Sequence, residues 1–476
     1  MRRSPSILVA VATVFLIALA GCAHRSSSFT PPYGQPRISG ARAMSVGARA
    51  MSAGASSATS AVARFLYASN QVSNDVSAYT IDATTGALTP VPGSPFPAGL
   101  GPFHSVAVDP AGKFAYVTND GSGNVSAYTI DATSGALTPV AGSPFTTGSH
   151  PYGVTVDPTG RFVYIPNRKG NSVSAFTIDP NSGALTPIAG SPFANGLSPY
   201  FVVVDSKGRF AFVTDEGSNA VSVFTIDATT GALASVPGSP FPAGSKPFAI
   251  DVDSTGSFAY VTNRYSCQGA SCQVSGFSID PITGALTPVA GSPFAAGVRP
   301  FDVAIDPTSK FVYIPNRFSN DISAYTVNAT TGTLTPMAGS PFAASTQPYN
   351  AVVDPSGRFI YVTNNAANTV SEFTINAVSG ALTLAGSFAA HSAPDGLAVA
   401  SLATTPPVVC GGGNCSDCQG NNGNDDNSGG GDQGNNGNND DNGDGHGCHH
   451  HHDGGDGDGG DHHGDGGSGQ DDTSGN

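Results

Sequence analysis

Six basic residues stand apart from the other cations of this 476-residue chain. Most of the others, such as Lys113 and Arg161, belong to a recurring Asp-Pro-x-Gly-Lys/Arg turn and are expected to be structural. The six lie instead in loops that vary between copies of a sequence repeat. Because guanidinium groups offer forked donors that fit carboxylate or phosphate, these residues predict a site for an anionic or polyhydroxylated ligand. They are Arg168, Lys169, Lys246, Arg264, Arg299 and Arg317.

Three further side chains in the same loops are candidates for acid–base chemistry. His150 immediately precedes a proline, as Lys246 and Arg299 do, and His104 lies three residues past the matching position in its own copy. Glu216 lies in another loop of this set. Imidazole and carboxylate groups are common general bases, so these three are the candidate catalytic residues. The alternative is that all of them are ordinary polar loop residues that maintain solubility.

Seven copies of one unit must position these residues. A Tyr-Val-Thr-Asn motif and its variants recur at intervals of 48 or 49 residues, with one interval of 53. Each copy predicts four short strands, as at 105–108, 114–118, 125–130 and 137–140, separated by Gly and Pro turns. A four-stranded sheet repeated seven times predicts an all-β, seven-bladed β-propeller. The motif ends at Asn70, Asn119, Asn167, Asp215, Asn263, Asn316 and Asn364.

The two ends of the repeat region predict how the ring closes. The first copy has no inner strand of its own, whereas residues 393–399 match the inner-strand segment 101–107. We therefore expect the C-terminal strand to complete the first blade, which leaves no open sheet edge. In a propeller the loops before the inner strands and those between second and third strands share one face. The candidate residues should gather there, around the channel mouth.

Literal Tyr-Val-Thr-Asn motifs occur at 116–119, 260–263 and 361–364. Over residues 61–402 the chain resembles the YVTN-type β-propeller repeat proteins of the lactonase-like family, whose members include 6-phosphogluconolactonase and a fungal carboxymuconate cyclase. The resemblance implies a binding or scaffold module at the cell envelope. The alternative is a hydrolase that opens a sugar-acid or related lactone. There, Glu216 or a histidine would act as base on water while arginine stabilises the oxyanion.

The interval of 53 residues contains a lengthened loop on the same face. Its extra residues include Cys267 and Cys272. In an exported protein, two cysteines this close predict a local disulfide that staples the loop. Free thiols or a metal site are the alternatives.

The N-terminus predicts an exported bacterial lipoprotein. Residues 1–22 have the pattern of a signal peptide, with an apolar run at 7–20, and end in Leu-Ala-Gly-Cys, which resembles a lipobox. We expect Cys22 to be lipidated and to anchor the chain in the cell envelope, at the outer membrane in a Gram-negative host. An ordinary secretory signal is the alternative. Residues 23–60, rich in Ser, Ala, Gly and Arg, predict a flexible tether.

The C-terminal segment 403–476 is rich in Gly, Asn, Asp and His and predicts a disordered tail. Its cysteine and histidines are good ligands for Zn, Ni or Cu, although the segment can equally be a solvating extension. We expect no cofactor to be required by the blades. The candidate metal ligands are Cys448, His449, His450, His451, His452, His462 and His463.

Charge and composition exclude some functions. Of 34 acidic residues, 14 lie after Ser401, where there is no Lys or Arg, so the rest of the chain is nearly neutral. It therefore lacks the broad basic surface that nucleic acids require. The chain has only two Glu, which is atypical of helical bundles. The expected partners are the membrane, through the lipid anchor, and an anionic small molecule, a polysaccharide or an envelope protein.

Overall fold

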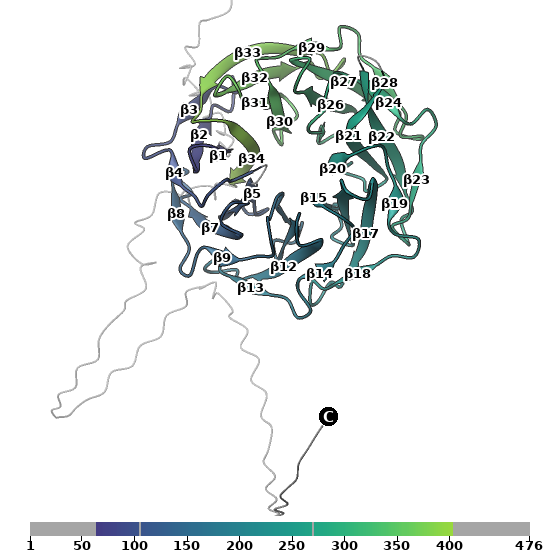
Figure 1. The fold of residues 1–476 in the computed structure, drawn as a ribbon. Coiled ribbons are helices and arrows are strands. Elements are labelled where there is room, and N and C mark those ends of the chain that lie inside the picture. Colours follow the sequence, from purple (N-terminus) through teal and green to yellow (C-terminus); the bar gives the residue numbers. More distant parts are fainter. Residues whose placement is uncertain (1–62, 104–105, 269–270, 403–476) are drawn as a thin grey trace, which may run out of the picture. The chain divides into compact units, whose positions relative to one another are not determined.

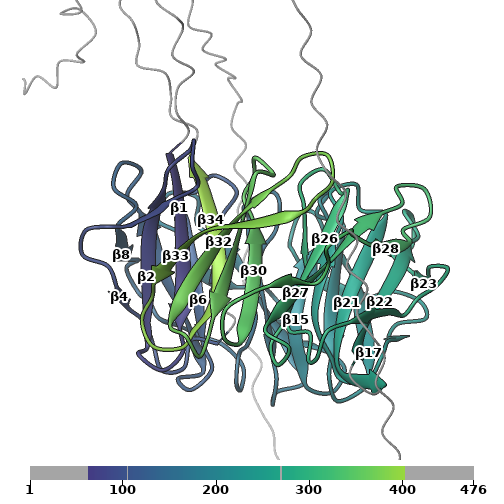
Figure 2. The same cartoon turned by 90° about the horizontal axis from the view of Figure 1, so that it is seen from above.

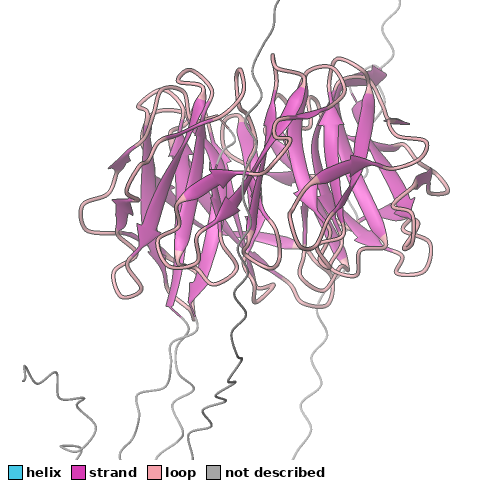
Figure 3. Ribbon diagram, turned by 90° about the horizontal axis from the view of Figure 1, so that it is seen from below, coloured by secondary structure: helices cyan, strands magenta, loops and turns pink. Residues whose placement is uncertain are grey.

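The computed structural model describes residues 63–103, 106–268 and 271–402. The regular secondary structure of these residues consists of β-strands alone (Figure 3). The strands form seven antiparallel sheets arranged as blades around a central axis (Figure 1). The predicted seven-bladed propeller is thus confirmed. We number the blades 1 to 7 in the chain order of their second strands, so that blade 1 contains both ends of the described chain. No described helix is long and apolar enough to span a membrane.

Each blade runs outward through four strand positions. The innermost strands are β34 (Pro394–Leu402), β5 (Val106–Val108), β10 (Thr155–Val156), β15 (Pro199–Val204), β20 (Pro247–Val252), β25 (Ala304–Ile305) and β30 (Pro348–Val353). The second strands are β1 (Ala63–Asn70), β6 (Phe114–Asn119), β11 (Phe162–Asn167), β16 (Phe210–Asp215), β21 (Phe258–Gln268), β26 (Phe311–Asn316) and β31 (Phe359–Asn364). The third strands are β2 (Asp75–Ile81), β7 (Asn124–Ile130), β12 (Ser172–Ile178), β17 (Ala220–Ile226), β22 (Ser271–Ile279), β27 (Asp321–Val327) and β32 (Thr369–Ile375). The fourth strands are β3 (Leu88–Pro90), β8 (Leu137–Pro139), β13 (Leu185–Pro187), β18 (Leu233–Ser235), β23 (Leu286–Pro288), β28 (Leu334–Pro336) and β33 (Leu382–Ala389).

The structure adds one feature to the predicted four-stranded blade. In six blades a fifth, short strand pairs with the third strand, and these strands are β4 (Phe96–Pro97), β9 (Phe145–Thr146), β14 (Phe193–Ala194), β19 (Phe241–Pro242), β24 (Phe294–Ala296) and β29 (Phe342–Ala343). Each follows a Gly-Ser-Pro sequence whose proline has no N–H for a sheet ladder, so the outer strand is split in two. In blade 7 this proline is missing, and β33 runs through as one bulged strand.

The ring closes as predicted from the two ends of the repeats. β34 pairs antiparallel with β1, so that Ala63 faces Leu402 and Asn70 faces Pro394. The closure joins residues more than 300 positions apart within one blade. The second strand of blade 1, β1, therefore has an inner neighbour like the second strands of the other blades.

Motif tyrosines tie neighbouring blades together. Tyr116 in β6 is fully buried, and its hydroxyl donates to the carbonyl of Gly183 in the next blade at 3.1 Å. Gly183 has φ +75°, and a Cβ there would lie 2.4 Å from the ring of Phe114, so the turn requires glycine. Tyr361 of blade 7 makes the equivalent bond to Gly86 of blade 1, at 2.7 Å. These bonds stabilise the blade-to-blade packing on which any site at the axis depends.

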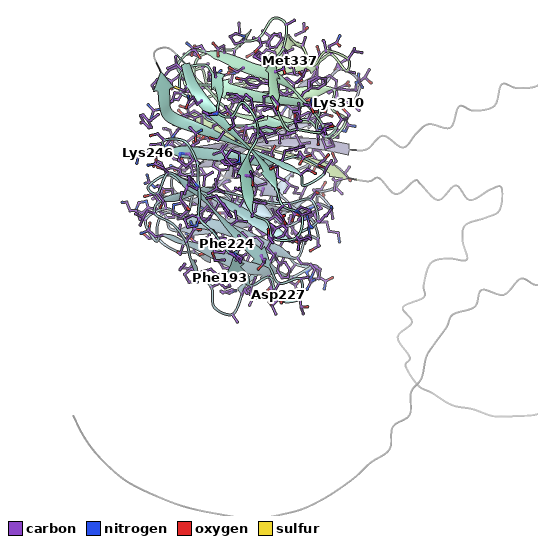
Figure 4. All side chains as sticks on the ribbon, turned by 90° about the vertical axis from the view of Figure 1, so that its right-hand side faces the viewer. Phe193, Phe224, Asp227, Lys246, Lys310 and Met337 are labelled. Atoms are coloured by element: carbon purple, nitrogen blue, oxygen red, sulfur yellow. The ribbon has the colours of Figure 1, made fainter. Side chains whose placement is uncertain are left out.

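The two faces of the ring carry different cations. Strands run across the thickness of the ring in the edge-on view (Figure 2). Lys246, before an inner strand, and Lys310, in an Asp-Pro turn, lie at opposite edges (Figure 4). Cations of the turn face brace the blades, since Arg64 pairs with Asp354 at 2.8 Å. The turn face thus has structural cations, and the mouth face has the candidate ones.

Candidate functional site

A row of aromatic side chains forms the floor of the channel mouth. Six of the seven inner strands are preceded or begun by a proline followed by Phe or Tyr. Successive rings are in contact, with centroids 4.1 to 5.1 Å apart. Tyr152 also reaches past its neighbour to Phe248, at 5.8 Å, so the rings meet near the axis. We call this row, which consists of Phe103, Tyr152, Tyr200, Phe248, Phe301 and Tyr349, the aromatic floor.

Asp395 occupies the seventh position of this row, where every other copy has an aromatic ring. Its side chain is fully buried. Burial, followed by the charge of Asp395, raises the pKa of the Tyr349 hydroxyl well above its ordinary range. Sequence reasoning gave this acid no role. The signal that identifies it is the single acidic residue in an otherwise aromatic column of the repeat alignment.

Arg264 lies on the aromatic floor and pairs with Glu216. Its guanidinium carbon is 4.0 Å from the ring centroid of Phe248, and its Nη2 donates to Glu216 Oε1 at 2.5 Å. Both side chains are mostly buried, with 9 % and 15 % of their surface exposed. Burial alone would lower the pKa of Arg264, but the Glu216 carboxylate and the nearby Tyr152 and Tyr200 together raise it. Arg264 therefore keeps its positive charge although it is buried beside the aromatic floor.

Three other predicted arginines surround this pair. Arg168 donates to the hydroxyl of Tyr200 at 3.1 Å, and the guanidinium carbon of Arg317 lies 4.9 Å from the ring centroid of Tyr349. Arg299 lies farther out, 5.9 Å from the ring centroid of Phe301. None of the three makes an ion pair with a carboxylate of the described residues. The mouth thus holds three positive charges that no described ion pair compensates.

We call Arg168, Arg264, Arg299 and Arg317 the arginine cluster. The remaining predicted residues lie apart from it. His150 contacts Asp120 at 3.2 Å, toward blade 2. Lys169 is exposed and Lys246 is half-buried, and no described contact joins either to the aromatic floor. His104 lies outside the described residues. The structure therefore brings together four of the six predicted cations and one of the three predicted acid–base groups.

The cysteine and metal predictions are only partly covered by the described chain. Cys272 is disulfide-bonded, but the side chain of Cys267 is outside the described residues, so their pairing stays a prediction. Cys22 and the seven candidate metal ligands of the tail also lie outside. Within the described residues, no three His, Cys, Asp or Glu side chains are arranged to hold a metal ion.

The residue before each inner-strand proline has an unusual backbone conformation. All seven have φ between +51° and +63°, yet only Gly101 is glycine. The left-handed conformation costs a non-glycine residue roughly 1–2 kcal/mol. His150, Lys246 and Arg299 occupy this position. Side chains are retained here, at the edge of the mouth, although glycine would fit the backbone better.

A hollow on the opposite face is a weaker candidate. It is lined by Asp109, Lys113 and Phe114, among others. These belong to the Asp-Pro-x-Gly-Lys/Arg-Phe turn that recurs around the ring. Asp109 itself accepts the N–H of Phe114 at 2.7 Å and so holds the turn. The residues of this hollow are explained by the repeat, whereas the arginines of the mouth are not.

Comparisons with known proteins agree with this architecture. The sequence matches the family described as "Lactonase, 7-bladed beta-propeller" over residues 57–241, 147–340 and 199–399. The fold is similar to a putative 6-phosphogluconolactonase of Bacteroides uniformis, with TM-score 0.61 and 21 % identity over 71 % of this chain and 99 % of that one. A putative 6-phosphogluconolactonase of Bacteroides fragilis gives TM-score 0.61 and 22 % identity, over 72 % and 99 % of the two chains.

A third similar structure is the periplasmic gluconolactonase of Pseudomonas aeruginosa, with TM-score 0.59 and 20 % identity over 72 % of this chain and 100 % of that one. At these identities the structural likeness shows the fold. No curated protein sequence matches the chain significantly.

Proposed function

The chain belongs to the seven-bladed lactonase propeller family, and from that premise we propose that its channel mouth binds a small anionic, polyhydroxylated ligand of the sugar-acid class. The observation that carries this proposal is the arginine cluster on the aromatic floor. Arg168, Arg299 and Arg317 lack ion-pair partners among the described residues. Guanidinium groups held against aromatic rings are partly desolvated, which strengthens a charge-assisted hydrogen bond to a carboxylate or phosphate.

The experiment titrates the full chain with gluconate, glucuronate and 6-phosphogluconate. Calorimetry measures the binding, and a thermal-shift assay measures the melting temperature. We expect the acids to bind and to raise the melting temperature, whereas neutral glucose does neither. Binding should weaken as salt rises, because the recognition is electrostatic. Equal binding of glucose and gluconate would contradict the proposal.

Lactone hydrolysis is the second candidate function, and the Glu216–Arg264 pair favours it. Glu216 would take a proton from water as the water oxygen attacks the lactone carbonyl carbon. Arg264 would stabilise the negative charge on the carbonyl oxygen. The ring C–O bond then breaks, and its oxygen takes the proton to give the open hydroxy acid. The names of the similar structures support this candidate, since they include gluconolactonases.

Glu216→Gln tests hydrolysis separately from binding. The amide oxygen of Gln can still accept the Arg264 hydrogen bond, but it cannot take a proton from water. If Glu216 is the base, turnover of glucono-1,5-lactone should fall by about 100-fold or more, while gluconate affinity changes little. A pH-stat measures acid release above the spontaneous rate. Unchanged turnover in the variant would remove Glu216 from this role.

We further propose that the protein is exported and anchored through Cys22, and that the tail takes up Zn, Ni or Cu. The signal-like N-terminus and the His-rich segment support these two proposals. Metabolic labelling with palmitate, lost in Cys22→Ser, tests the first proposal. Loss of metal uptake on deletion of residues 408–476 tests the second.

A further inference from the structure

An alternating stack of aromatic and arginine side chains extends from the mouth to its rim in blades 5 and 6. The guanidinium carbon of Arg299 lies 5.0 Å from the ring centroid of Tyr265 and 4.9 Å from that of Phe318. The guanidinium carbon of Arg317 lies 5.4 Å from the ring centroid of Phe318. The Tyr265 hydroxyl also accepts a hydrogen bond from Arg299 Nη2 at 2.8 Å. We call Tyr265, Arg299, Phe318 and Arg317 the rim stack.

The aromatic members of the rim stack are exposed to solvent. Tyr265 is 53 % exposed and Phe318 is 50 % exposed, whereas the aromatic floor is buried or half-buried. Both are the second residue after their Tyr-Val-Thr-Asn-type motif, Phe318 in a turn and Tyr265 in the extension of β21. The other five copies have at this position Val72, Gly121, Lys169, Gly217 and Ala366. The blade therefore has no need of an aromatic ring here, and two neighbouring blades both have one.

A second departure from the repeat holds Arg299 in place. In blade 4, Asn219 Oδ1 accepts the N–H of Lys246 at 2.8 Å, and in blade 6 Asn320 makes the same bond to Gln347. In blade 5 the disulfide-bonded Cys272 occupies this asparagine position, and its Sγ accepts the N–H of Arg299 at 3.1 Å. The residues expected to form a lengthened loop instead extend β21 and β22, and this extension supplies both Tyr265 and the anchor for Arg299. Three residues that depart from the repeat, Tyr265, Cys272 and Arg299, therefore lie together in this part of the rim.

We propose that the rim stack is a second subsite, and that the ligand is an acidic oligosaccharide with one sugar acid at the mouth and the next ring on Phe318 and Tyr265. This inference rests on the proposed sugar-acid site. The polarised C–H face of a sugar ring packs well on an aromatic face, whose quadrupole is negative. The flanking Arg299 and Arg317 complement the carboxylate that each residue of such a chain carries. A neutral glycan has no carboxylate that could pair with these two arginines.

Calorimetry of the full chain with galacturonate and with trigalacturonate tests the inference. The trimer should bind about tenfold more tightly than the monomer, because a second ring is seated on an aromatic pair. Phe318→Ala should remove most of this gain, so that the trimer binds the variant about as tightly as the monomer does. Leu197→Ala is the matched control, since Leu197 is 57 % exposed on the same face but lies outside the rim stack. It should retain the full gain.

The outcomes separate the two proposals. If monomer and trimer bind equally tightly, the rim subsite is wrong while the sugar-acid site stands. If neither binds, both are wrong. If neutral maltotriose shows the same gain over glucose, or if a single-stranded oligonucleotide binds and Phe318→Ala abolishes that binding, the acidic-glycan assignment is overturned. A gain for trigalacturonate that is lost in Phe318→Ala and kept in Leu197→Ala supports it.

Discussion

Arg264→Met should weaken gluconate binding by about 10- to 100-fold, as expected when a charged hydrogen-bond donor is removed from a desolvated site. It should also destabilise the fold by on the order of 3 kcal/mol, because the Glu216 carboxyl group, only 15 % exposed, would lose its ion-pair partner. Few side chains of the mouth make so many contacts, since Arg264 lies over Phe248, Tyr200 and Phe301 and pairs with Glu216. Calorimetry and denaturant unfolding measure the two effects.

The double variant Arg264→Met/Glu216→Gln is the control for this prediction. It removes both charges, so most of the lost stability should return, whereas the ligand affinity should not. A double variant that is as unstable as Arg264→Met would show that packing on the aromatic floor, rather than the ion pair, holds the mouth together. An Arg264→Met protein with normal affinity would contradict the proposed site.

Asp215→Asn should stabilise the protein at neutral pH. Asp215 is fully buried at a position where the other six copies have Asn, and burial raises its pKa from 3.8 to about 7. A buried acid with a raised pKa favours folding at low pH, and this contribution is lost as pH rises from about 4 to about 7. The substitution removes that loss, for a gain of at most about 4 kcal/mol at pH 8.

Neighbouring hydrogen bonds should survive this change. Asp215 now accepts from Ser222 Oγ at 2.6 Å and from the side chain of Asn195. The amide introduced by Asp215→Asn can donate to Ser222, as Asn119 does to Ser126 at 3.0 Å, and still accept from Asn195. Denaturant unfolding at several pH values checks the prediction. The gain should grow between pH 4 and pH 7 and then level off, and a gain independent of pH would contradict it.

Wild-type stability itself should fall over the same pH range. Asp251 and Asp302, on or beside the inner strands, also have pKa values raised to about 7 by burial. Asp215→Asn therefore removes only part of the pH dependence, and the remaining slope comes from groups closer to the axis.

The fold was predictable because the repeat states the same pattern seven times. The spacing of the motif fixes the blade, and the orphan segment at 393–399 fixes the closure. The fifth strands were not predicted, since a two-residue strand has no hydrophobic periodicity of its own. The role of the proline in splitting the outer strand becomes clear only by comparison with blade 7, which lacks it.

The sequence predicts on which face of the ring the site lies, but it does not predict the contacts between the side chains of the site. Arg168, Arg264, Arg299 and Arg317 were selected because they vary between copies, and the structure gathers all four at the mouth. The Arg264–Glu216 pair could not be foreseen, because it joins residues of two blades that are 48 positions apart in the sequence. The contacts of the aromatic floor could not be foreseen either. Aromatic residues after a proline in an inner strand equally predict core packing.

The most direct test of an anion site at the mouth compares two substitutions in blade 6, each of which removes one positive charge. Arg317 lies at the mouth, and Lys310 lies in the turn on the opposite face (Figure 4). Calorimetric titration of the full chain with 6-phosphogluconate should show about tenfold weaker binding for Arg317→Gln and a change of less than twofold for Lys310→Gln. Equal effects of the two substitutions, or no effect of Arg317→Gln, would contradict an anion site at the channel mouth.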